Sequence, residues 1–114
     1  MKHDNVKTVE TYLEGLRKKD LSDVPLAADM YFEDPIAGKH HGAENFRAFL
    51  SGFLRSINDV RVIKHVCEEA YVATHFEVEG VFGNIRILEI FKIENGEITE
   101  AIGYFDPRPV IGGF

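Results

Sequence analysis

The sequence has a single cysteine and no long apolar run, and each absence excludes a class of protein. Because Cys67 has no second cysteine to pair with, an internal disulfide framework is impossible, and a reducing compartment is the natural expectation. No stretch approaches the ~18 apolar residues that span a bilayer, and the first residues lack the apolar segment of a signal peptide. The sequence therefore predicts a cytoplasmic protein that does not enter a membrane.

Basic residues are also few, with 13 Lys and Arg against 19 Asp and Glu and a net charge of -6. Nucleic acids bind clustered Lys and Arg that neutralise phosphates, so we expect no nucleic-acid partner. The histidines, including the adjacent pair His40 and His41, have no Cys, Asp or Glu cluster around them at metal-site spacing. No glycine-rich phosphate loop is present either. We expect neither a metal nor a cofactor.

Aromatic residues are plentiful, since the 114 residues include nine Phe and four Tyr. A chain of this length fits one domain, residues 1–114. The first helix is expected over about Asn5–Lys19, because Val6, Val9, Leu13 and Leu16 recur at helical spacing.

A stronger helix is expected over about Ala43–Ser56, where a broad apolar face must cover another part of the molecule. Between the two helices we expect a short helix within Asp20–Ala27, a strand at Met30–Glu33 and a loop at Pro35–His41.

From Asp59 onward apolar residues alternate with polar ones, which is typical of strands. The expected strands cover about Val60–Val66, Tyr71–Val81, Ile85–Ile93 and Ile98–Phe105. Asn95-Gly96 predicts a tight hairpin between the last two, because both residues tolerate positive φ. Helices followed by such an antiparallel meander indicate an α+β domain with the helices packed on one face of the sheet.

Glu89 breaks the apolar pattern, since Ile85, Ile87, Phe91 and Ile93 share its face of the strand. An unpaired carboxylate there would be costly, and a raised pKa would keep the group protonated. A neutral carboxyl can donate a hydrogen bond to a developing oxyanion. The alternative is that Glu89 faces solvent or pairs with a Lys or Arg on a neighbouring strand.

Two further candidates are Asp34, which closes a strand before Pro35, and Tyr12, near the buried side of the first helix. Each has a simpler interpretation. Aspartate before proline is common in turns, and a tyrosine at this place on a helix is often a core or boundary residue.

These three residues lie in segments that resemble the ketosteroid isomerase and SnoaL-like family of the nuclear transport factor 2-like (NTF2-like) superfamily. The segments are Val9–Tyr12, Phe32–Pro35, His41-Gly42, Ile87–Phe91 and Gly103–Phe105. The resemblance implies an NTF2-like or cystatin-like cone: a curved antiparallel sheet packed against N-terminal helices around an apolar pocket, often in a homodimer.

The resemblance also implies roles. Asp34 matches the family's general base, which moves a proton between carbons of a dienolate, while Tyr12 and a protonated Glu89 match its oxyanion-hole donors. The family's neutral active-site carboxyl is itself the model for that role of Glu89. The expected partner is a small hydrophobic ketone that undergoes double-bond isomerisation. The expected pocket lining is Phe32, Phe49, Phe53, Phe82 and Phe105, with His75 at the edge.

Several positions depart from the family pattern. Glu89 is one methylene longer than the family's aspartic acid, and Leu50 stands where some members have a second tyrosine. The alternatives are a non-catalytic binding or dimerisation module, a SnoaL-like cyclase, and an epoxide hydrolase. Asp106 resembles the hydrolase pattern and could reach the pocket mouth, but the partnering Arg and Asp of that enzyme are missing around Arg86.

Overall fold

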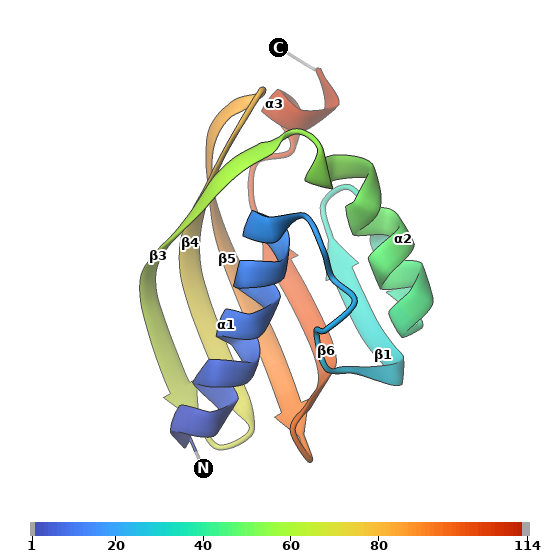
Figure 1. Cartoon of the computed structure of the whole chain (residues 1–114), viewed down its shortest axis with the longest axis vertical. Helices are drawn as coiled ribbons and strands as arrows, with labels where there is room; N and C mark the ends of the chain where they lie inside the picture. The colour runs from blue at the N-terminus through green and yellow to red at the C-terminus, as the bar shows by residue number, and fades with distance from the viewer. Residues whose placement is uncertain (1, 113–114) are drawn as a thin grey trace.

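The computed structural model describes residues 2–112, and in it two helices lie on one face of a curved, open sheet of six strands (Figure 1). The elements are α1 (Lys2–Lys18), β1 (Leu26–Asp34), β2 (Gly38–His41), α2 (Ala43–Leu54), β3 (Ile57–Glu68), β4 (Tyr71–Gly80), β5 (Gly83–Glu94), β6 (Glu97–Tyr104) and the short α3 (Arg108–Ile111). The strand order is β2-β1-β6-β5-β4-β3. The predicted α+β class with helices on one face is confirmed.

Helix α1 buries the predicted stripe, with Val9, Leu13 and Leu16 almost inaccessible to solvent. The helix ends at Lys18, and Lys19 takes a left-handed conformation with a φ of 63°. The N–H of Asp20 then donates to the carbonyl oxygen of Gly15, which closes the helix end. A Cβ on Gly15 would lie 3.0 Å from the backbone carbonyl oxygen of Asp20 and 3.0 Å from a methyl carbon of Leu21, so a side chain here would crowd the turn.

The short helix predicted within residues 20–27 is wrong, because side chains satisfy the backbone of this segment instead. Asp20 accepts hydrogen bonds from the N–H and hydroxyl of Ser22, which form a local turn. Arg47 on α2 donates to the carbonyl oxygens of Leu21 and Val24. Strand β1 consequently begins at residue 26, four residues before the expected position.

The predicted hairpin between β5 and β6 is confirmed, with φ of 53° at Asn95 and 77° at Gly96. Two features differ from the sequence-based expectation. Strand β1 pairs with β6 in parallel, so the sheet is not wholly antiparallel. The expected loop at 35–41 contains β2, which pairs with β1 after a turn in which Gly38 has a φ of 77°.

The register shifts twice between β3 and β4, between Ile57 and Asp59 and between Val62 and Lys64. Such bulges increase local bending and twist. The sheet curves around the helices, and the core fills the concave side. In α2, Phe46 is buried, whereas Phe49 and Phe53 are only partly so. The apolar face of α2 therefore meets the core at one end and a hollow at the other.

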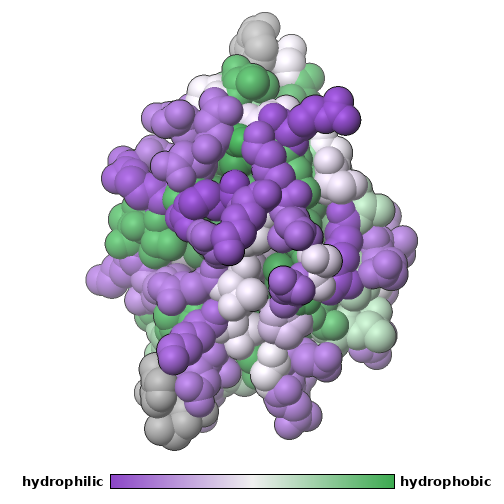
Figure 2. Space-filling model, viewed as in Figure 1, coloured by the Kyte–Doolittle hydropathy of each residue, from purple (hydrophilic) through white to green (hydrophobic). Residues whose placement is uncertain are grey.

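Figure 2 shows hydrophilic residues over most of the helix-bearing face, with hydrophobic ones between them. Large apolar side chains are exposed elsewhere on the sheet, including Val66, Leu88 and Tyr104. The predicted homodimer stays a prediction. Among residues 2–112, no helix combines the length and the apolar composition that a membrane crossing requires.

Candidate active site

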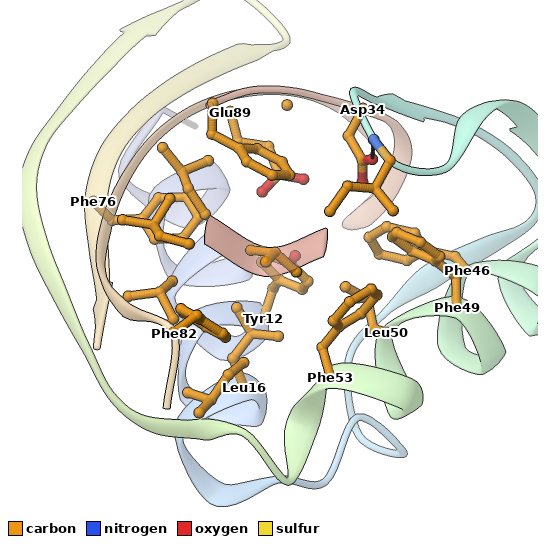
Figure 3. A pocket seen from close by; sticks show the side chains of 18 residues that line it. Tyr12, Leu16, Asp34, Phe46, Phe49, Leu50, Phe53, Phe76, Phe82 and Glu89 are labelled. Atoms are coloured by element: carbon orange, nitrogen blue, oxygen red, sulfur yellow. Dashed lines mark hydrogen bonds between the residues drawn. The ribbon is translucent and has the colours of Figure 1, made fainter. Parts of the chain in front are cut away.

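A pocket lies between the concave face of the sheet and helices α1 and α2 (Figure 3). Its empty volume is about 720 Å³, which includes the open solvent at its mouth. Of its 18 lining residues, 14 have hydrocarbon side chains and Gly103 has none. The three polar ones are Tyr12, Asp34 and Glu89. An apolar cavity with a few converging polar groups is the usual form of a small-molecule site.

Four of the six predicted pocket residues line this cavity: Phe49, Phe53, Phe82 and Phe105. The prediction for Phe32 is wrong, because its ring packs in the core with its centroid 5.0 Å from that of Phe46. Phe32 therefore supports the pocket wall from behind.

The prediction for His75 is also wrong. Thr74 and Phe76 are buried on the concave side of β4, and successive side chains of a strand point to opposite faces, so His75 points away from the cavity. The same alternation could have identified the missed residues Val78, Ile85 and Ile87. They lie on the strand faces that also carry Phe76 and Glu89.

Aromatic packing fixes the position of the Tyr12 ring, which α1 carries. Its ring stacks on Phe46 with a centroid distance of 5.9 Å and meets Phe91 edge-on at 5.4 Å. Burial, followed by the charges of Glu89 and Asp34, raises the pKa of Tyr12 well above its ordinary value. The phenol therefore keeps its proton and can act as a hydrogen-bond donor in the cavity.

Asp34 ends β1 and has two functions in the structure. Its Oδ1 accepts hydrogen bonds from the backbone N–H groups of Ile36 and Ala37, each at 2.7 Å, which fixes the turn after the strand. Among residues 2–112, no hydrogen bond involves Oδ2. The simple interpretation of Asp34 as a turn residue is thus correct but incomplete, because its side chain also lines the pocket.

Glu89 lies in the middle of β5 with 7% of its surface exposed. The alternative of a solvent-facing or ion-paired Glu89 is wrong, since its neighbours across the sheet are Thr74 and Gly103. Burial, and secondly the charge of Asp34, raises the pKa of Glu89 to about 8, while hydrogen bonding with Tyr12 acts in the opposite direction. Glu89 is therefore protonated at neutral pH.

The structure brings Tyr12, Asp34 and Glu89 together, and Figure 3 shows all three side chains directed into one cavity. Leu16, Phe53 and Phe82 lie on the other side of that cavity. None of the 18 lining residues is a Lys, Arg or His. The polar end of the pocket thus offers two carboxyls and a phenol without a cation.

Asp106 does not line the pocket. Its carboxylate forms a two-oxygen ion pair with Arg108, which lowers the pKa of Asp106 to about 2. Arg86 lies beside Glu77 on the neighbouring strand. The expectation that Asp106 reaches the pocket mouth is therefore wrong, and the arrangement gives no support to an epoxide hydrolase.

Two of the histidines, His40 and His65, make hydrogen-bond contacts with neighbouring residues. The Nδ1 atom of His65 lies 2.8 Å from the hydroxyl oxygen of the buried Thr74, and His40 bonds the carbonyl oxygen of Ala37. Within residues 2–112, no group of three or more His, Cys, Asp or Glu residues could hold a metal ion.

Solved structures of low sequence identity share this fold. An NTF2-like protein of unknown function from Cytophaga hutchinsonii superposes with a TM-score of 0.80 at 22% identity, covering 94% of each chain. A protein assigned as a SnoaL-like polyketide cyclase from Jannaschia sp. CCS1 gives 0.83 at 16% identity, covering 96% of this chain and 90% of that one. An LEH-like epoxide hydrolase from M. tuberculosis gives 0.75 at 19% identity, with coverages of 98% and 90%.

No curated protein of similar sequence was found. A sequence profile provides the closer assignment, because the SnoaL-like domain profile matches residues 9–101, which include Tyr12, Asp34 and Glu89. The match extends from α1 into β6 and covers all the lining residues of the pocket except Gly103, Phe105 and Val110. The chain belongs to the SnoaL-like domain family.

Proposed function

We propose that this protein is a proton-transfer enzyme that moves the double bond of a small, hydrophobic ketone into conjugation with its carbonyl. One observation supports this function above all others. Tyr12, Asp34 and Glu89 come from three separate elements, and they meet in one otherwise apolar pocket. A pair of acids in which one is held neutral is a common arrangement for dividing base and hydrogen-bond-donor roles.

In the proposed reaction, Asp34 removes a proton from the carbon between the carbonyl group and the double bond. The electrons of that C–H bond move through the unsaturated system to the carbonyl oxygen and form a dienolate. Asp34 then returns the same proton to the far carbon of the former double bond, and the carbonyl is restored. The net change is an isomerisation that consumes no water, cofactor or proton.

Tyr12 and Glu89 would stabilise the dienolate oxygen by donating hydrogen bonds. Both groups keep their protons near neutral pH because burial raises their pKa values. Donors aimed at developing charge in a water-poor site are worth more than in water, and loss of one commonly costs ~100- to 1,000-fold in rate. The apolar walls would also exclude the water that competes for the oxyanion.

The test uses cyclohex-3-en-1-one and follows the rise in enone absorbance. We expect Asp34→Asn to lower kcat/KM by roughly 100- to 10,000-fold, the usual contribution of a general base. Asp106→Asn is the matched control, because this exposed acid is paired with Arg108 outside the pocket, and its rate should equal that of the wild type. A wild-type rate no higher than that of buffer, or an unchanged rate in Asp34→Asn, would refute the proposal.

A further inference from the structure

The polar end of the pocket has a floor without a side chain. Gly103 on β6 lies directly opposite Glu89 on β5. A Cβ atom on Gly103 would lie 3.6 Å from Cβ of Asp34 and 4.0 Å from Cδ of Glu89. Gly103 thus lies beneath both acids, and its backbone forms the surface between them.

The backbone conformation does not require glycine at this position, since Gly103 is not among the residues with positive φ. The space is also not filled from elsewhere, because Gly103 itself lines the cavity. A methyl group would make ordinary van der Waals contacts with both acids, whereas a branched side chain would occupy the volume between their carboxyls. The missing side chain therefore leaves a slot in the pocket.

The neighbours of this slot limit its shape. On β6, buried Ala101 lies two residues before Gly103, and Phe105, which also lines the pocket, follows just after the strand ends at Tyr104. The side chains nearest to the missing Cβ are those of Asp34 and Glu89, so the two acids bound the slot, and the backbone of Gly103 forms its base. A flat group can lie on the backbone there, but a group with a substituent directed at the sheet cannot.

The same space explains how the longer acid is accommodated. Glu89 has one methylene more than an aspartic acid, yet its carboxyl still lies in the pocket beside Tyr12 and Asp34. A branched side chain on the facing residue would compete with the longer Glu89 for this volume, and Gly103 presents none.

We infer that Gly103 is a specificity-determining residue, and that its slot admits the flat, uncharged enone segment of a ketone whose face toward the sheet carries no substituent. The inference rests on the proposed function and names the substrate class more narrowly. The substrate is not an anion, because the 18 lining residues include two acids and no cationic side chain, so an anionic group would enter without a counter-ion.

The experiment compares cyclohex-3-en-1-one with its 6,6-dimethyl derivative, which carries one methyl on each ring face, so one always points at the floor. Each rate is divided by the acetate-catalysed rate of the same ketone, which removes intrinsic reactivity. We expect the wild type to prefer the unsubstituted ketone by roughly 10- to 200-fold, the usual discrimination for one misplaced methyl group. Gly103→Ala should lower kcat/KM for the unsubstituted ketone by a similar factor, with its thermal unfolding midpoint little changed.

Binding is measured in parallel so that the two proposals can fail separately. Cyclohexanone and 2,2-dimethylcyclohexanone, which cannot isomerise, are titrated against the wild type and Gly103→Ala by calorimetry. The wild type could isomerise both ketones equally well, with Gly103→Ala unaffected. That result would refute the role of Gly103 in specificity, while the proposed function would stand. Weaker cyclohexanone binding in Gly103→Ala without any isomerisation would support the slot and refute the proposed function. If Gly103→Ala binds cyclohexanone as the wild type does and no isomerisation is observed, both proposals are refuted.

Discussion

The charge of Asp34 raises the pKa of Glu89, since the two carboxyls share the polar end of one pocket. Burial of Glu89 is the larger cause of the shift, and the interaction with Tyr12 partly opposes it. Near pH 7 Glu89 therefore holds a proton, and the charge of Asp34 is one of the causes. In the proposed function, differences of environment rather than of residue type would separate the base from the hydrogen-bond donor.

The first prediction concerns this coupling. Asp34→Asn should lower the pKa of Glu89 from about 8, but leave it above the ordinary value, because burial remains. Tyr12→Phe should raise it further, since the opposing hydrogen bond is lost while the aromatic packing on Phe46 and Phe91 is retained. The measurement is a carbon-13 NMR titration of the Glu89 carboxyl. A pKa that does not change in Asp34→Asn would show that the two acids are not coupled.

The second prediction links the same pKa to stability. Folding favours protonated Glu89, so this contribution is complete below the ordinary pKa near 4.5 and is lost as pH rises to about 8. The side chain in Glu89→Gln cannot ionise. As pH rises through this window, the free energy of unfolding of the variant should therefore increase relative to that of the wild type by about 1.4 kcal/mol per pH unit. Urea denaturation from pH 4.5 to pH 8.5 measures the difference.

The control for that experiment is Glu77→Gln. Arg61 and Arg86 lower the pKa of Glu77, so its contribution is present above the ordinary glutamate pKa and is lost only as pH falls below that value. Between pH 4.5 and pH 8.5 the Glu77→Gln profile should therefore run parallel to that of the wild type. A Glu89→Gln profile that runs parallel to that of the wild type would contradict a protonated, buried Glu89.

Much of the fold follows from residue spacing. Alternation in β4, β5 and β6 and the helical stripe of α1 are local signals, and the Asn95-Gly96 hairpin depends on two residues alone. The segment at 20–25 could not be predicted in this way, because Arg47 from a distant helix holds its carbonyl groups. The parallel pairing of β1 with β6 likewise depends on contacts far apart in the sequence.

The site could be predicted where a residue conflicts with its surroundings. Glu89 in an apolar row is such a conflict, and its burial follows from the alternation of β5. Asp34 and Tyr12 gave no comparable signal alone and were identified through the family resemblance. Gly103 was part of that resemblance, but a missing side chain becomes informative only when the two acids above it are known.

The third prediction tests the contact that replaced the expected helix. Arg47→Met removes the donors to the carbonyl oxygens of Leu21 and Val24 but keeps much of the side-chain length. Each carbonyl would lose a charge-assisted hydrogen bond, so we expect a loss of roughly 1–3 kcal/mol in the free energy of unfolding. Arg55→Met, at an exposed position just after α2, is the control and should be nearly neutral. Equal effects of the two substitutions would contradict a specific role for Arg47.

The fourth prediction is the pH dependence of the proposed isomerisation. Above pH 8 Glu89 loses its proton, so it ceases to donate a hydrogen bond and adds a negative charge beside the dienolate. For wild-type enzyme, kcat/KM should therefore fall about tenfold per pH unit on the alkaline side. Glu89→Gln keeps a neutral N–H donor at every pH, so its rate should be lower near neutrality but should not fall at this pKa. Tyr12→Phe should lower the rate and keep the alkaline fall, moved to higher pH. An alkaline fall at the same pH in Glu89→Gln would mean that another group controls it, and Glu89 would then be a buried acid without a role in the reaction.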